Sequence, residues 1–299
     1  STGTGEAIER LFLDAGFPEH VFQHMALDNA VAADVIAHEA VVGVTFTGSA
    51  AAGAEVAAQA GKHLKRVVLE LGGSDPAVVL ADADIQLAAD AIVASRLNNT
   101  GQVCIAAKRI IAVSAVKDNL LKAIKASVKN YSIGNPLDKD IVMGPMARAD
   151  LRDTVHAQVL ASIEKGAQLV MGGKIPDEKG FYYPVTILTH VTPGMPAFDD
   201  ELFGPVIALI AVDDEVEALQ LANQTVYGLG ASIFTRDEVR GERIAMDELE
   251  AGTCFVNGKV TSDPRVPFGG IKQSGFGREL SREGILAFVN MKTVAIGHA

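Results

Sequence analysis

Cys104 is the strongest candidate for chemistry in this sequence, because a cysteine that ionises is a potent nucleophile. It follows the tetrapeptide Asn-Thr-Gly-Gln (residues 99–102), whose residue types form turns that present a side chain and its backbone amide to a ligand. The basic pair Lys108 and Arg109 would stabilise a thiolate only if it points back toward the sulfur. A lone cysteine is more often a small, inert core residue, and this is how we interpret Cys254. The residues alone leave both interpretations of Cys104 open.

Glu70 is a second candidate, near the end of an apolar strand and just before two glycines (Leu-Glu-Leu-Gly-Gly, residues 69–73). Its side chain alternates to the face opposite Leu69 and Leu71. If that face lines a cleft, partial burial raises the carboxyl pKa toward the value of a general base. The alternative is a solvated glutamate at a strand end.

Thr47, Gly48 and Ser49 join a valine-rich strand to an alanine-rich helix. A glycine at such a turn allows close backbone approach, and the helix N-terminus favours a phosphate group. Ser49 is equally suited to be a simple helix N-cap. The segment is neither a Gly-x-Gly-x-x-Gly fingerprint nor a P-loop, since Ala54 and Glu55 replace the lysine and hydroxyl residue that a triphosphate site needs.

Several classes of function are disfavoured. The 26 basic and 37 acidic residues give a net charge of −11, which opposes binding to nucleic acid. No apolar run is long enough to cross a membrane, so we expect no membrane partner. Two cysteines far apart predict no disulfide framework and a reducing, cytoplasmic location. No clustered metal ligands and no Gly-x-Ser-x-Gly elbow are present, so we expect neither a metal centre nor a serine hydrolase.

The periodicity of the chain predicts alternating strands and helices, which is typical of an α/β protein with a parallel, helix-covered sheet. Residues 134–145 and 192–205 are rich in glycine and proline and are predicted to be surface loops. The first helix has no strand before it, so part of a sheet is expected upstream. We expect helices over 6–16, 30–40, 50–64, 85–99, 118–129, 148–166, 215–225 and 238–252, and strands over 21–27, 41–49, 65–73, 109–115, 167–173, 182–188, 205–212, 228–235 and 252–258.

Five segments in order resemble the aldehyde dehydrogenase superfamily: Phe-Thr-Gly-Ser at 46–49, Leu-Glu-Leu-Gly-Gly at 69–73, Asn-Thr-Gly-Gln-Val-Cys at 99–104, Asp-Glu-Leu-Phe-Gly-Pro at 200–205, and 267–279. The resemblance implies NAD or NADP as cofactor, Cys104 as the nucleophile toward an aldehyde, and Glu70 as the base that activates water. It also implies a cofactor site formed by Thr47, Gly48, Ser49, Leu71, Glu201 and Phe203.

The same resemblance implies three parts. Residues 1–70 correspond to the C-terminal half of a Rossmann-type dinucleotide-binding domain, 71–280 to an α/β catalytic domain, and 281–299 to a C-terminal helix and an oligomerisation strand over 288–298. It implies a homo-oligomer and an N-terminally truncated chain, which lacks an oxyanion-hole asparagine and a lysine that contacts the adenosine ribose.

Within the superfamily, residues 99–109 and 263–280 look most like bacterial succinate-semialdehyde dehydrogenases. A substrate carboxylate needs a cationic or hydrogen-bonding anchor, for which Ser262 and Arg265 are candidates, although Asn98 stands where some such enzymes carry an arginine. Two alternatives remain: a catalytically incompetent fragment that keeps the fold and self-associates, and a thiol esterase that uses Cys104 and Glu70 without hydride transfer.

Overall fold

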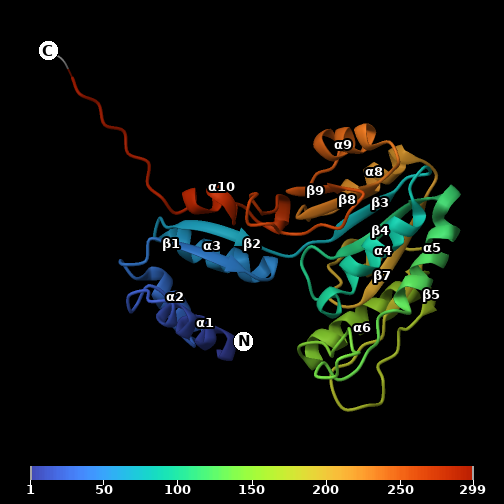
Figure 1. Cartoon of the computed structure of the whole chain (residues 1–299), viewed down its shortest axis with the longest axis horizontal. Coiled ribbons are helices and arrows are strands. Elements are labelled where there is room, and N and C mark those ends of the chain that lie inside the picture. The colour runs from blue at the N-terminus through green and yellow to red at the C-terminus, as the bar shows by residue number, and fades with distance from the viewer. Residues whose placement is uncertain (1, 298–299) are drawn as a thin grey trace.

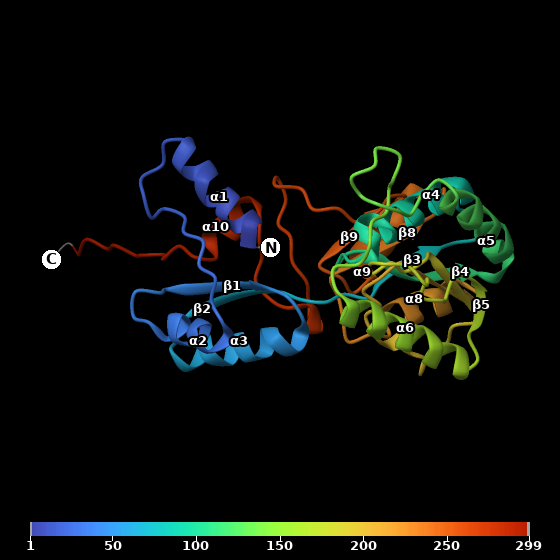
Figure 2. The same cartoon turned by 90° about the horizontal axis from the view of Figure 1, so that it is seen from below.

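A computed structural model describes residues 2–297 and shows two lobes (Figure 1). The small lobe contains α1 (Thr2–Asp14), α2 (Asn29–Ala37), β1 (Gly43–Thr47), α3 (Ala50–Lys62) and β2 (Arg66–Glu70), with α10 (Ser281–Leu286) beside it. The large lobe contains the elements from β3 to β9 (Figure 2). The chain crosses from the small lobe to the large lobe just after Glu70.

The large lobe is built on a seven-stranded sheet in the order β5-β6-β7-β4-β3-β8-β9. All neighbouring strands are parallel except β5 and β6, which confirms the predicted α/β class. The strands are β3 (Asp75–Val79), β4 (Ala107–Val113), β5 (Gln168–Met171), β6 (Thr186–Thr189), β7 (Val206–Val212), β8 (Gly230–Phe234) and β9 (Thr253–Val256).

Helices cover both faces of this sheet, and alternation along the strands decides which core each residue joins. Ala77 and Val79 pack with α4 (Ile85–Arg96) and α5 (Ser114–Val128), whereas Val78 packs on the opposite face. That opposite face is covered by α6 (Ala149–Glu164), α8 (Glu215–Asn223) and α9 (Glu238–Asp247). The result is a doubly wound sheet with two cores.

Three sequence-based predictions differ from the structure. Residues 21–27 form no strand, because they pair with no other described segment, and Val21 and Met25 are more than half exposed. The interior strand β3 escaped prediction because Pro76 lies in it; a register shift between Asp75 and Pro76 accommodates the missing N–H.

The third difference concerns 192–205, which is not a surface loop. It contains the short helix α7 (Pro196–Asp199), and its apolar side chains enter the core: Phe198 is fully buried and Leu202 is 3% exposed. Glycine and proline correctly indicated irregular backbone here, but they carry no information about burial.

The chain returns to the small lobe after β9. Leu69 N–H donates to the Phe276 carbonyl (2.9 Å) and Leu71 N–H to the Ser274 carbonyl (3.1 Å), so the segment after the short 3₁₀ helix η2 (Lys272–Ser274) lines the free edge of β2. Residues 288–297 pair with no strand of the described part of the chain, and Met291, Val294 and Ile296 are largely exposed. Oligomerisation through 288–298 stays a prediction, and His298 lies outside the described residues.

We expect the small lobe to exchange its amide hydrogens faster than the large lobe. Two-stranded sheets are marginally stable, and among the described residues β1 pairs only with β2, while α1 and α2 contain no buried residue. Hydrogen-exchange mass spectrometry of the 299-residue chain should show residues 43–47 exchanging at least about tenfold faster than 107–113. Equal protection of the two strands would contradict this expectation.

Candidate active site

Cys104 lies in the short connection between the 3₁₀ helix η1 (Asn98–Gly101) and β4, at the end of the sheet where the parallel strands β3 and β4 begin. Asn99, Thr100 and Gly101 all have positive φ (49°, 57° and 76°), and for the β-branched Thr100 this conformation is strained. The Asn99 amide donates to the Gln102 carbonyl and the Gln102 amide to the Asn99 carbonyl, both at 3.1 Å. The turn predicted from sequence is therefore real and strongly constrained.

Arg96, which sequence reasoning missed, ties this turn to the segment that carries Glu201. Its guanidinium is fully buried and donates to the carbonyls of Gly101 (3.3 Å), Val206 (2.6 Å), Leu202 and Gly204. Burial lowers the Arg96 pKa to about 9. The two backbones lie so close together here that a side chain at Gly101 would overlap the Gly204 carbonyl, which explains why this residue is a glycine.

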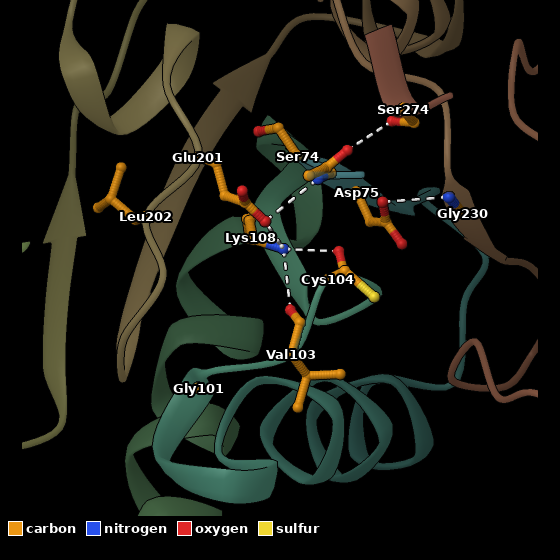
Figure 3. Close-up of polar contacts among 12 residues, drawn as sticks. Ser74, Asp75, Gly101, Val103, Cys104, Lys108, Glu201, Leu202, Gly230 and Ser274 are labelled. Atoms are coloured by element: carbon orange, nitrogen blue, oxygen red, sulfur yellow. Dashed lines mark hydrogen bonds and ion pairs between the residues drawn. The ribbon is translucent and has the colours of Figure 1, made fainter. Parts of the chain in front are cut away.

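The two basic residues after Cys104 point in different directions. Arg109 donates to the carbonyls of Ser74, Leu221 and Ala222 and stabilises the backbone away from the thiol. Lys108 instead points back: its Nζ donates to the carbonyls of Cys104 (2.7 Å) and Val103 (3.1 Å) (Figure 3). The same ammonium lies 3.4 Å from Glu201 Oε1.

The Cys104 thiol is partly buried and surrounded by charges of both signs. Burial is the main cause that raises its pKa, and Lys108 opposes this effect. The negative charges of Asp75 and Glu70 raise the pKa further. Because these charges act on one sulfur, Cys104 and Glu70 belong to the same electrostatic environment, although they come from different lobes.

Glu70 is 3% exposed, and neither of its carboxyl oxygens has a hydrogen-bond partner among the described residues. The Gly270 amide is close enough to lower its pKa slightly but does not meet the geometry of a hydrogen bond to either oxygen. Burial, and next the charge of Glu279, raise the pKa to about 7, while Arg278 lowers it. An unpartnered carboxyl with this pKa is suited to take a proton from water near neutral pH.

A chain of close contacts connects the predicted cofactor residues. Ser49 caps α3 by accepting from the Ala52 amide (3.3 Å), and Gly48 N–H donates to the Glu70 carbonyl (3.0 Å). The buried Leu71 packs against Gly53 of α3, where any side chain would overlap it.

The contacts continue to the segment 200–205. Any side chain at Gly72 would overlap Glu201 Oε2, and Glu201 Oε1 accepts from Gly73 N–H (3.1 Å). A methyl group at Gly73 would lie 2.6 Å from the Cys104 carbonyl oxygen. Thr47 and Gly48 are exposed before the N-terminus of α3, Glu201 is partly exposed, and Phe203 is half-buried. We call these residues the predicted cofactor wall, because a helix N-terminus attracts phosphate.

A cavity of about 340 Å³ lies against the loop that carries Cys104. Val103 and Ile105, which flank Cys104, form one wall, and Ser262, Lys259 and Asn98 are among the other lining residues. The structure therefore brings Ser262 to the reactive loop. Arg265 does not line this cavity: it is exposed and makes a bidentate ion pair with Asp263 (2.6 and 2.9 Å). Lys259, which no sequence pattern singles out, is the cation that the cavity contains.

Two further expectations concern absences and the second cysteine. Over residues 2–297, no group of three histidine, cysteine or acidic side chains could hold a metal ion, and no helix is long and apolar enough to span a membrane. Cys254 lies in β9 and packs against the core, and burial raises its pKa to about 11.

The fold and this arrangement define a known class of protein. The aldehyde dehydrogenase family model matches residues 1–294, and the chain belongs to that family.

Among curated proteins, the chain is 47% identical over 292 residues to a succinate semialdehyde dehydrogenase of Escherichia coli (strain K12), covering 98% of this chain and 63% of the relative. It is 45% identical over 288 residues to a succinate-semialdehyde dehydrogenase [NADP(+)] of Deinococcus radiodurans, covering 96% and 60%. The chain thus spans less than two thirds of the length of these relatives.

Solved structures agree on the fold. A succinic semialdehyde dehydrogenase from Streptococcus pyogenes in complex with NADP+ superposes with a TM-score of 0.96 at 36% identity, covering 99% of this chain and 65% of that one. A lactaldehyde dehydrogenase from Escherichia coli gives a TM-score of 0.93 at 33% identity, covering 98% and 61%. The fold is therefore shared by relatives named for different aldehydes.

Proposed function

We propose that the protein oxidises a small aliphatic semialdehyde to its carboxylic acid, with NAD or NADP as oxidant and Cys104 as nucleophile. The observation that carries the proposal is the convergence of a constrained, partly buried Cys104 and an unpartnered, buried Glu70 in one electrostatic environment. Family membership and the similarity to succinate-semialdehyde dehydrogenases support it. On cysteine usage alone, we place the protein in the cytoplasm.

The first half of the reaction uses the cysteine loop. The Cys104 thiolate adds to the aldehyde carbon, and its backbone N–H stabilises the oxyanion that forms. NAD or NADP, when bound, would supply the acceptor for the hydride of this carbon, and loss of that hydride converts the adduct into a thioester on Cys104. Ser49 and Glu201 are the residues that would hold the cofactor's phosphate and ribose hydroxyl groups.

The second half uses Glu70. Its carboxylate removes a proton from water, which attacks the thioester carbon and releases the acid and the Cys104 thiolate. The balance is aldehyde, oxidised cofactor and water to acid, reduced cofactor and a proton. A raised pKa suits Glu70 to this task, since a base with a pKa of about 7 is both available and effective near neutral pH.

The cavity beside Val103 and Ile105 suits a substrate with an anionic far end. Lys259 and Ser262 supply an ammonium and a hydroxyl, which together can bind a carboxylate. We therefore assign the anchor to Ser262 and Lys259, and not to Arg265, whose charge is paired with Asp263.

The test compares succinate semialdehyde with butanal, which lacks the carboxylate, in the whole protein that contains this chain. Formation of reduced cofactor should require NAD or NADP, and Lys259→Ala should raise KM for succinate semialdehyde by about tenfold while leaving KM for butanal unchanged. Arg265→Ala is the matched control and should change neither. Ester hydrolysis without any cofactor-dependent aldehyde oxidation would support the esterase alternative, whereas no turnover of either kind by the 299-residue chain tested on its own would support the incompetent fragment.

A further inference from the structure

Lys108 is a buried charge that the reaction as described does not use. Its side chain is 2% exposed, and it reaches back from β4 beneath the Cys104 loop (Figure 3). An ammonium group has three N–H donors, and here three acceptors surround it: the carbonyls of Val103 and Cys104 and the carboxylate of Glu201. Burial lowers the pKa of Lys108, and the negative charges of Glu201 and Asp75 oppose this effect.

The contacts of Lys108 join two parts of the proposed site. On one side it fixes the backbone that presents the nucleophile, and on the other it fixes Glu201, whose second contact is the Gly73 amide. In Figure 3 the Cys104 carbonyl turns toward Lys108 and the sulfur points away, so the lysine acts through the backbone and through its charge and does not touch the reacting atoms. This makes it a positioning residue.

We propose that Lys108 couples the cofactor wall to the nucleophile: it holds Glu201 and the Cys104 loop in one fixed arrangement, and its positive charge promotes the reactive thiolate. The proposal rests on the assignment of Cys104 as nucleophile. Four other charged groups act on Lys108 or on the Cys104 thiol. Glu201 and Asp75 attract the Lys108 charge, Arg96 repels it, and Glu70 acts on the thiol alone.

Asp75 allows a second test, in which the titration of the Cys104 thiol is expected to move in the opposite direction. It is 2% exposed, its Oδ1 accepts from Gly230 N–H (3.1 Å), and its Oδ2 has no partner among the described residues. Its negative charge disfavours the Cys104 thiolate, whereas Lys108 favours it. Removing one charge at a time should therefore move the titration of the thiol in opposite directions.

The experiment measures alkylation of Cys104 by iodoacetamide across a pH series, followed by mass spectrometry. All proteins carry Cys254→Ala, which leaves Cys104 as the single thiol of the 299 residues. Lys108→Met should move the midpoint of the alkylation profile to higher pH, and a midpoint about one pH unit higher slows alkylation at neutral pH about tenfold. Asp75→Asn should move the midpoint to lower pH. Lys117→Met, which changes a partly exposed lysine of α5, is the matched control and should leave the profile unchanged.

Lys108→Gln separates the role of the hydrogen bonds from the role of the charge, and it keeps the test informative if Lys108→Met misfolds. Glutamine keeps an N–H donor but carries no charge, so the midpoint should still move upward while the thermal transition stays closer to that of the parent protein. A wild-type alkylation profile in folded Lys108→Gln would overturn the proposal. Because alkylation needs neither aldehyde nor cofactor, an altered profile in a protein without dehydrogenase activity would reject the proposed function and leave the role of Lys108 intact.

Discussion

Cys104→Ala should abolish the formation of reduced cofactor, with turnover falling by about 10⁴-fold or more, because no other side chain in the site can form the covalent intermediate. The substitution removes only a sulfur atom from a turn whose geometry depends on Asn99, Gln102 and Arg96. The variant should therefore keep the parent's melting temperature and its affinity for the cofactor. Both are measured on the same preparation, by thermal unfolding and by calorimetric titration of NAD or NADP.

Cys254→Ala is the matched control, since it removes the second free cysteine of the described residues from β9. That variant should retain cofactor-dependent turnover. Persistent dehydrogenase activity in Cys104→Ala, or its loss only in Cys254→Ala, would reject the assignment of the nucleophile.

Glu70→Gln should separate the two halves of the reaction. A single burst of reduced cofactor should form and then stop, because the thioester forms without Glu70 but its hydrolysis loses the base. Steady-state turnover should fall by about 10²–10⁴-fold. In the parent protein, hydrolysis should speed up as the pH rises through about 7, where Glu70 ionises. Stopped-flow measurement of the burst across this range checks both statements.

The same substitution has a predictable effect on stability. Burial raises the Glu70 pKa from 4.5 to about 7, so the folded state prefers the protonated carboxyl. The stability that this group contributes is complete below about pH 4.5 and is lost as the pH rises through about 7. Glutamine does not ionise, so its burial costs no more at high pH than at low pH. Glu70→Gln should therefore melt at a higher temperature than the parent at pH values above 7 but not at acidic pH. A lower melting temperature at alkaline pH would show that the carboxylate is stabilised by contacts that the structure lacks.

Sequence reasoning was most successful where local patterns decide the structure. Periodicity located the parallel sheet, and the residue types at 99–102 indicated the turn before Cys104. It failed where tertiary contacts decide. The segment 21–27 alternates like a strand but has no pairing partner among the described residues, and Pro76 concealed a strand that a register shift accommodates.

The site shows the same limit. Lys108 and Arg109 are adjacent and chemically alike, and no sequence pattern tells which one turns back toward the cysteine. Arg96 resembles any arginine at the end of a helix, yet it binds four backbone carbonyls, three of them from distant residues. Similarly, Arg265 has the right charge for a substrate anchor, but its exposed pairing with Asp263 and the position of Lys259 follow only from coordinates.

Glu70 is the last residue of β2 in the small lobe, whereas Cys104 precedes β4 in the large lobe. In the proposed mechanism the base and the nucleophile therefore come from different lobes, which are connected by residues 71–74 and by the returning segment 274–276. Substitutions that displace Glu70 alone should slow hydrolysis of the thioester and spare its formation, whereas damage to α4 or β4 should slow formation of the thioester on Cys104.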